Sequence, residues 1–170
     1  NGHAVVYLGD DERGEFLYRF VSKNKYTQGG DNRDLLEDGT LFVAKFIDDL
    51  RGEWLPLTTA TTGMSDAEIC IHTRIAASKV GATTMDRPEW VAANTVKNEV
   101  YCALTNNKNR GVKPNKGGDA TPAGGHNPIE PAIHKCAILR IILPMVSPGI
   151  CSLPLEIQMF IPMSMLGRAM

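Results

Sequence analysis

The sequence has no excess of charge of one sign. Its 18 Lys and Arg residues nearly balance its 19 Asp and Glu residues, which gives a formal net charge of -1 at pH 7. There is also no run of five or six like charges, so the charge pattern gives no reason to expect binding to nucleic acid or to an anionic membrane. We therefore expect neither as a partner, and a charged ligand would have to meet a local cluster.

The common metal-binding and catalytic patterns are missing too. The four cysteines lie 32, 34 and 15 residues apart, which matches no Cys-x-x-Cys spacing. We expect buried, small apolar residues at these positions, which are Cys70, Cys102, Cys136 and Cys151. The four histidines show no zinc-hydrolase pattern, and no Gly-x-Ser-x-Gly elbow, Walker loop or Gly-x-Gly-x-x-Gly turn occurs. These absences set aside classical zinc hydrolases, serine hydrolases, P-loop enzymes and Rossmann dehydrogenases.

Short apolar runs that alternate with polar residues dominate the first two thirds of the chain. They predict six strands joined by turns into three antiparallel hairpins, over residues 4–8, 15–21, 41–46, 53–57, 89–95 and 99–105. One helix interrupts them, because Ser65 and Glu68 have the spacing of a capping box and Gly81 is a suitable stop. Residues 106–128 read as a polar loop without regular structure.

This order of elements favours an all-β fold. Strands joined mostly by turns suit a propeller or a sandwich better than a parallel α/β sheet. A four-stranded propeller blade takes about forty residues, so the stretch would supply about two blades and one inserted helix. We therefore predict an all-β, partial β-propeller and not a closed ring.

The strongest candidate for chemistry is the segment Asp86-Arg87-Pro88-Glu89-Trp90. Pro88 fixes its own φ and favours an extended Arg87, and residues two apart in an extended chain point to the same side. Arg87 and Glu89 are therefore expected to project together, with a guanidinium suited to phosphate oxygens beside a carboxylate suited to Ca²⁺ or Fe³⁺. The alternative is a solvated Arg and Glu at the start of a strand.

Acidic residues gather at the end of the first predicted strand, where Asp10, Asp11 and Glu12 follow Gly9. The backbone changes direction there, which lets side chains converge on a cation. Asp10 and Asp11 are therefore candidate metal ligands. The alternative is a turn with solvated charges.

Five segments, in this order along the chain, resemble the PhoX alkaline phosphatase family: YLGDDERGE (7–15), GTLFVAKF (39–46), GEWLPL (52–57), DRPEWVA (86–92) and VYCALTNN (100–107). The likeness is nearly continuous over residues 4–128, about three quarters of the chain. It implies a six-bladed β-propeller, periplasmic or secreted through twin-arginine export, that hydrolyses phosphate monoesters with calcium and iron in its central channel. By this resemblance Arg87 holds the substrate phosphate, Glu89 is a metal ligand, and Asp10 or Asp11 lies on the metal side.

The likeness stops after Asn127-Pro128. In the family an Arg and then a Tyr-Gly pair follow, whereas Ile129 comes next here. Residues 129–170 hold five of the seven methionines, five of the ten prolines and two acids, and the prolines break every apolar run before it is long enough to span a membrane. We therefore divide the chain into a β-propeller fragment, residues 1–128, and a hydrophobic tail, residues 129–170, of the kind that a shifted reading frame gives.

The chain also starts without the marks of an export signal. Asn1 is followed by neither a basic n-region nor an apolar h-region, which we interpret as an internal start. The family's iron-binding cysteine lies before the part of the family that this sequence resembles, so none of the four cysteines is assigned that role. We therefore expect a fragment of a metal-dependent alkaline phosphatase, inactive alone and lacking the remaining blades, with a non-catalytic β-propeller binding module as the alternative.

Overall fold

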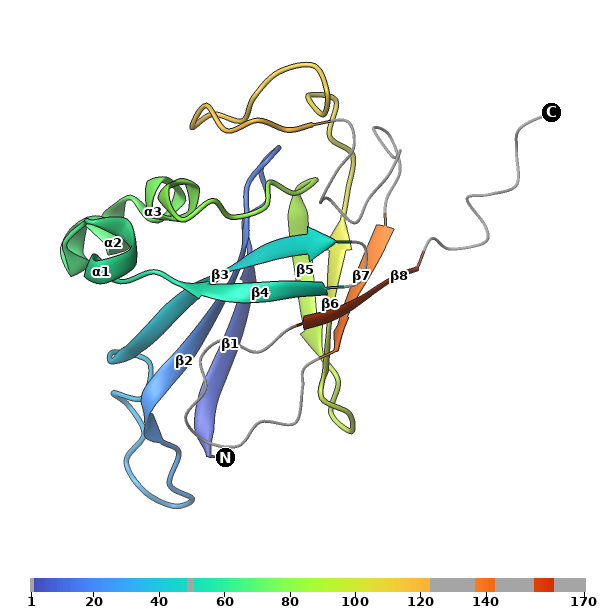
Figure 1. Ribbon diagram of the computed structural model, residues 1–170. Coiled ribbons are helices and arrows are strands. Elements are labelled where there is room, and N and C mark those ends of the chain that lie inside the picture. Colours follow the sequence, from blue (N-terminus) through green and yellow to red (C-terminus); the bar gives the residue numbers. More distant parts are fainter. Residues whose placement is uncertain (1, 49–50, 123–136, 143–154, 161–170) are drawn as a thin grey trace.

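One antiparallel sheet with three short helices makes up the described part of the chain. The computed structural model describes residues 2–48, 51–122, 137–142 and 155–160 (Figure 1). The strands, in chain order, are β1 (His3–Gly9), β2 (Leu17–Lys25), β3 (Gly39–Asp48), β4 (Arg51–Pro56), β5 (Pro88–Ala93), β6 (Glu99–Leu104), β7 (Ala137–Ile142) and β8 (Leu155–Phe160). Their order in the sheet is β1-β2-β3-β4-β8-β7-β6-β5. The structure is thus mostly β-sheet with few helices, which agrees with the predicted all-β class.

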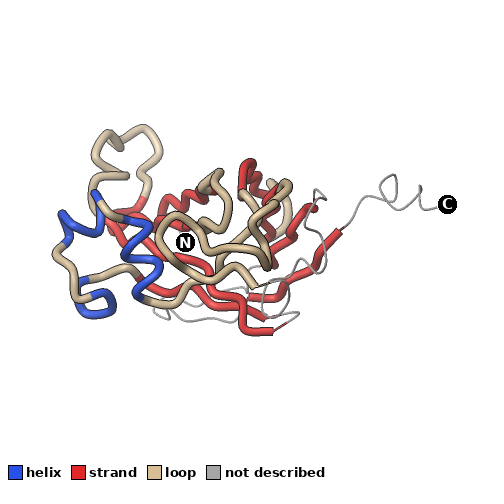
Figure 2. The backbone as a smooth tube through the Cα atoms, turned by 90° about the horizontal axis from the view of Figure 1, so that it is seen from above, coloured by secondary structure: helices blue, strands red, loops and turns tan. Residues whose placement is uncertain are grey.

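The strand order divides the sheet into two four-stranded meanders, β1 to β4 and β5 to β8. The two halves meet along β4 and β8, where Arg51 pairs with Glu156 and Gly52 with Leu155. At the far ends of the order, the first strands of the two meanders, β1 and β5, also contact each other. The sheet therefore curls until these two strands lie side by side, while the helices gather at one side of it (Figure 2).

The predicted alternation in the first meander separates two hydrophobic cores. One face packs toward the second meander, through Leu17, Phe42, Ala44, Phe46 and Trp54 with Met85, Val100, Cys102, Leu104 and Ile141. The other face packs under the helices, through Phe16, Tyr18, Val43 and Leu57 with Met64, Ile69, Ala76 and Ala77. The first meander is thus covered on both faces, which explains why neither set of alternating positions in β2 and β3 is purely polar.

The predicted single helix is divided in the structure. Helices α1 (Thr59–Thr62), α2 (Asp66–Ile71) and α3 (Thr73–Lys79) follow one another. The capping box at Ser65 and Glu68 is confirmed, since each backbone N–H is bonded by the other side chain. The break comes at His72, where the Thr73 hydroxyl donates to the Ile69 carbonyl oxygen (2.8 Å) and takes the place of a regular backbone bond. Within α2, Ile69 faces the core and Ile71 is exposed, because residues two apart lie on nearly opposite sides of a helix.

The prediction of buried cysteines is confirmed for one residue and wrong for another. Cys102 is buried, but Cys70 is exposed because its neighbour Ile69 occupies the inner side of α2; Cys136 and Cys151 lie outside the described residues. Strands β7 and β8 fall within residues 129–170, where the sequence pattern predicts none. The division at residue 128 and the shifted reading frame stay predictions. Within the described ranges, no helix has both the length and the apolar character needed to cross a membrane.

Candidate functional site

The start of β5 packs against the end of β1. Gly9 ends β1, and a side chain would not fit there, because an added Cβ atom would lie 2.4 Å from the carbonyl oxygen of Pro88, the first residue of β5. Just beyond, Arg13 forms an isolated antiparallel bridge with Asp86. The acidic segment after β1 and the segment 86–90 are therefore neighbours in the fold, although they lie far apart in the sequence.

Arg87 has an unusual backbone conformation. Its φ is 51°, in the left-handed region that no other non-glycine residue of the described part adopts, and such a conformation costs an L-residue roughly 1–2 kcal/mol. The expectation of an extended Arg87 is therefore wrong. The preceding residue is held on both sides, because the Asp86 carbonyl accepts from the Thr105 N–H (2.9 Å) and its carboxylate accepts from Arg110. Because these bonds fix Asp86, the backbone changes direction at Arg87, just before Pro88.

Arg87 nevertheless reaches Glu89, as the sequence predicts. Its Nη2 atom lies 3.2 Å from Glu89 Oε1 and 3.0 Å from Asp11 Oδ1. The Thr105 hydroxyl donates to the same oxygen of Glu89 (3.2 Å). One guanidinium thus joins the two meanders between two carboxylates, and 26% of the Arg87 side chain faces solvent. We call Asp11, Arg87 and Glu89 the Arg87 cluster.

Asp10 belongs to a second cluster. Arg74 on α3 donates from Nε and Nη2 to the two carboxylate oxygens of Asp10, each at 2.7 Å. The same Nε lies 3.5 Å from Oε2 of Glu15, whose side chain is 1% exposed. Burial raises the pKa of Glu15 to about 7, although Arg74 acts in the opposite direction. We call Asp10, Glu15 and Arg74 the Arg74 cluster.

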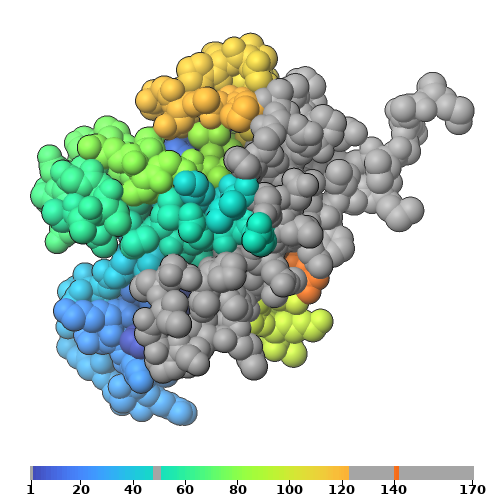
Figure 3. Space-filling view, viewed as in Figure 1, coloured from blue at the N-terminus to red at the C-terminus, as the bar shows by residue number. Residues whose placement is uncertain are grey.

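The loop after β6 covers this region. Lys116 contacts Glu12 (Nζ to Oε2, 2.5 Å), and this bond lowers the pKa of Glu12 to about 2. Asp119 accepts from the hydroxyl of Ser78 on α3 (2.6 Å). In the space-filling view the loop, yellow to orange, lies against the green helical region (Figure 3). A cleft of about 280 Å³ between the loop and α3 is lined by residues that include Glu15, Lys116 and Asp119.

A buried ion pair between Arg110 of the same loop and Asp86 anchors the loop to the residue before Arg87. Arg110 Nε donates to Asp86 Oδ1 (2.5 Å), and both side chains are 1% exposed. The Arg110 guanidinium also donates to the carbonyl oxygens of Pro122 (3.1 Å) and Thr84 (3.2 Å). Burial raises the pKa of Asp86, and Arg110 offsets part of that rise. Asp86, directly before Arg87, is therefore fixed from the loop.

The predicted metal ligands do not converge. The described residues include no group of three or more His, Cys, Asp or Glu side chains placed to hold a metal ion. Asp11 and Glu89 share Arg87, and Asp10 is bonded through both oxygens to Arg74. The two carboxylates of the Arg87 cluster have the donor chemistry for part of a calcium or iron site, and the other ligands would have to come from elsewhere. The metal roles of Glu89, Asp10 and Asp11 stay predictions.

Sequence reasoning missed the residues that hold the candidates in place, which are Glu15, Arg74, Thr105 and Arg110. Arg74 lies 64 residues from Asp10, and Arg110 lies 24 residues from Asp86. No local spacing indicates such pairs, because they depend on how the loop and the helices fold back on the sheet.

Comparison with known proteins identifies a family for the chain. A family model described as alkaline phosphatase PhoX matches residues 1–136, a range that contains both clusters. The chain belongs to the alkaline phosphatase PhoX family. The resemblance stated from the sequence is therefore confirmed. The comparison with curated proteins gives no match.

A solved structure of the PhoX family is similar to the chain. It is that of Pseudomonas fluorescens PhoX in complex with vanadate, a transition state analogue, with a TM-score of 0.74 and 40% sequence identity. The match covers 92% of this chain and 29% of the Pseudomonas PhoX chain. This chain thus spans less than a third of the length of that PhoX protein.

Proposed function

We propose that the chain is part of a metal-dependent alkaline phosphatase that hydrolyses phosphate monoesters, and that it is inactive alone. The observation that carries the proposal is the Arg87 cluster. The Arg87 guanidinium is partly exposed, and the Arg87 backbone is held in a strained conformation where β5 contacts β1. A guanidinium can donate to two phosphate oxygens at once. Strained backbone of this kind is often found at functional sites.

The chain's own residues have separate parts in this proposal. Arg87 contacts the phosphate and stabilises negative charge on its equatorial oxygens. Asp11 and Glu89 orient the guanidinium, and Thr105 in turn orients Glu89. The vanadate in Pseudomonas PhoX supports a phosphoryl-transfer site in that protein, and family membership extends the hypothesis to this chain.

Calcium and iron, which the resemblance implies, would be held in part by Glu89 and Asp11. Such ions supply positive charge and an activated oxygen nucleophile when bound. Asp10 is a third candidate that would first have to leave Arg74. As part of the same proposal, the two meanders are two blades of a six-bladed propeller, and the parent protein is periplasmic or secreted through twin-arginine export.

An assay of the purified chain tests the claim of inactivity. We expect no hydrolysis of p-nitrophenyl phosphate and no stoichiometric iron, with or without added Ca²⁺ and Fe³⁺, because the described residues bring too few ligands together. Hydrolysis at the rate of a complete alkaline phosphatase, dependent on both metals, would contradict the proposal that this is an incomplete unit.

One observation favours a second candidate, a non-catalytic β-propeller binding module. Arg87 already has two carboxylate partners, which neutralise the charge that a phosphate would need. A full-length protein, restored by joining this chain to the remaining blades with their metal ligands, separates the two. Phosphatase activity supports the enzyme, whereas a folded protein that neither hydrolyses p-nitrophenyl phosphate nor binds metal supports the binding module.

A further inference from the structure

Arg74 links a helix to the turn that carries the Arg87 cluster. It makes a two-point ion pair with Asp10, the first residue after β1, and a longer contact with Glu15 at the other end of the turn. Asp11, the next residue along, meets Arg87. A single side chain thus bridges both ends of residues 10–15, next to the proposed phosphate contact.

The position of Arg74 is itself fixed by packing. Ala76 and Ala77 of α3 are fully buried in the core under the helices, together with Phe16 and Tyr18 of the first meander. Ser78 adds a bond to the loop through Asp119. The guanidinium therefore projects from a helix that cannot shift without opening the core.

The turn has some backbone bonds of its own. The Asp10 N–H donates to the Phe16 carbonyl (3.1 Å), and the Glu12 N–H to the Asp10 carbonyl (2.7 Å). Within the described part, no backbone hydrogen bond holds Asp11, which lies between these two bonded residues and whose side chain meets Arg87. Because Arg74 holds the carboxylate of the adjacent residue, Asp10, it can fix the position of Asp11 as well.

We infer that Arg74 is a positioning residue, which holds Asp10 and the turn at residues 10–15 so that Asp11 stays beside Arg87. The inference deepens the proposed function and rests on it for the importance of Arg87. The competing explanation is an ordinary surface ion pair, since 45% of the Arg74 side chain is exposed and such pairs contribute little. Two observations argue against that explanation. The pair is bidentate, and Arg74 is the cation beside the buried Glu15, whose carboxylate oxygens have no hydrogen-bond partner.

Hydrogen exchange of the purified chain tests the inference without any ligand. In Arg74→Gln we expect the amides of Asp10, Glu12 and Glu15 to exchange about fivefold faster, while strands β2 and β3 keep their protection. Arginine-selective NMR should also show faster rotation of the Arg87 guanidinium, because Asp11 no longer holds it. Arg74→Lys, which keeps the charge but not the two-point geometry, should lie between Arg74→Gln and the unmodified chain.

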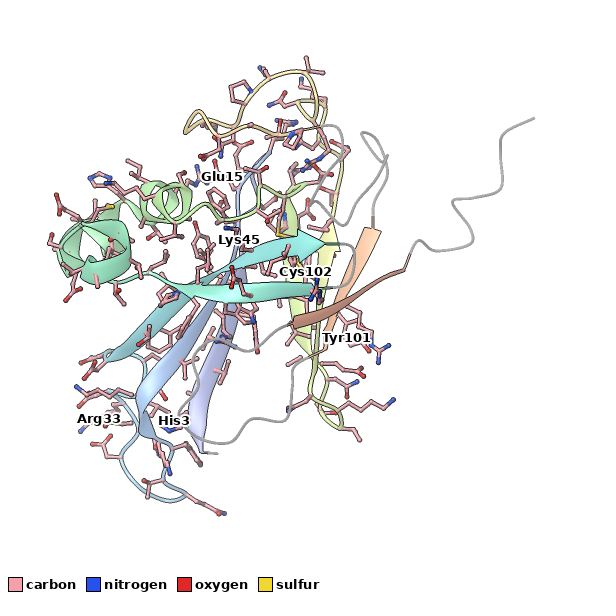
Figure 4. All side chains as sticks on the ribbon, viewed as in Figure 1. His3, Glu15, Arg33, Lys45, Tyr101 and Cys102 are labelled. Carbon is pink, nitrogen blue, oxygen red and sulfur yellow. The ribbon has the colours of Figure 1, made fainter. Side chains whose placement is uncertain are left out.

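The matched control is Arg33→Gln. Arg33 makes a similar two-point pair with Asp31, from Nε to Oδ1 and from Nη2 to Oδ2, on an exposed loop at the opposite end of the molecule from Glu15 (Figure 4). This variant should change neither the exchange of the turn nor the NMR signal of Arg87. Equal loss of protection in all strands of Arg74→Gln, or no change at the turn and at Arg87, would overturn the inference.

A vanadate titration of the same variants separates this inference from the proposed function. If the unmodified chain binds vanadate and Arg74→Gln binds it several-fold more weakly, both are supported. If the chain binds vanadate and Arg74→Gln binds it equally well, the positioning role is overturned and the proposed function is not. If the unmodified chain fails to bind vanadate, the role of Arg87 as a phosphate contact in the isolated chain fails, and the exchange data still decide whether Arg74 positions Asp11.

Discussion

Replacing Arg110 with Met is expected to lower the free energy of unfolding by about 3–5 kcal/mol. The variant leaves the Asp86 carboxylate, 1% exposed, without its cation, and it removes two further bonds to the carbonyl oxygens of Thr84 and Pro122. Unfolding in urea, followed by the fluorescence of the buried Trp54, measures the loss.

Two further variants show whether the loss comes from the uncompensated charge. Asp86→Asn combined with Arg110→Met should recover part of the stability, because no buried charge remains. Arg33→Met removes an exposed arginine from its pair with Asp31 and should have no measurable effect. An Arg110→Met chain as stable as the unmodified one would show that the pair with Asp86 does not anchor the loop.

Replacing Glu15 with Gln is expected to stabilise the chain at pH 8, by on the order of 2–3 kcal/mol, and to have little effect at pH 4.5. Burial raises the pKa of this carboxyl from 4.5 to about 7 in the fold. Below about pH 4.5 the group is protonated in both the folded and the unfolded chain, so it causes no destabilisation. Between about pH 4.5 and 7 the unfolded chain has released this proton while the folded chain still holds it, so the stability of the unmodified chain falls across this range. Above about pH 7 the group is ionised in both states, and the full destabilisation is present.

Urea unfolding at several pH values between 4.5 and 8 measures this difference. The two chains should have equal midpoints at the acid end and diverge toward pH 8. Glu37→Gln, at an exposed position, is the matched control and should follow the unmodified chain throughout. A constant gap between Glu15→Gln and the unmodified chain at every pH would show that ionisation of Glu15 has no part in the effect.

The sequence was informative where a local pattern has a local cause. Alternation predicted the strands β1 to β6, because each position in β2 and β3 faces one of two cores. The spacing of Ser65 and Glu68 predicted the start of α2, since a capping box is complete within four residues. Arg87 and Glu89 were expected to project together, and their side chains lie 3.2 Å apart, although the extended Arg87 on which that expectation rested is wrong.

The rest depended on contacts between distant segments. Arg87 is left-handed and not extended, because Asp86 is held by Arg110 and Thr105, which proximity to Pro88 alone does not indicate. Asp10 and Asp11 read alike as neighbouring acids, yet one pairs with α3 and the other with Arg87. Strands β7 and β8 were missed because prolines interrupt the apolar pattern around them.

Vanadate binding to the purified chain, followed by ⁵¹V NMR, tests the phosphate-binding role of the Arg87 cluster most directly. We expect the unmodified chain and Arg33→Gln to bind vanadate alike, and Arg87→Gln to bind it at least about tenfold more weakly, because hydrogen bonds to a charged guanidinium are lost. Gln carries the same left-handed strain as Arg at this position, so the comparison isolates the charge. Equal binding by Arg87→Gln and the unmodified chain, or no binding by either, would contradict that role.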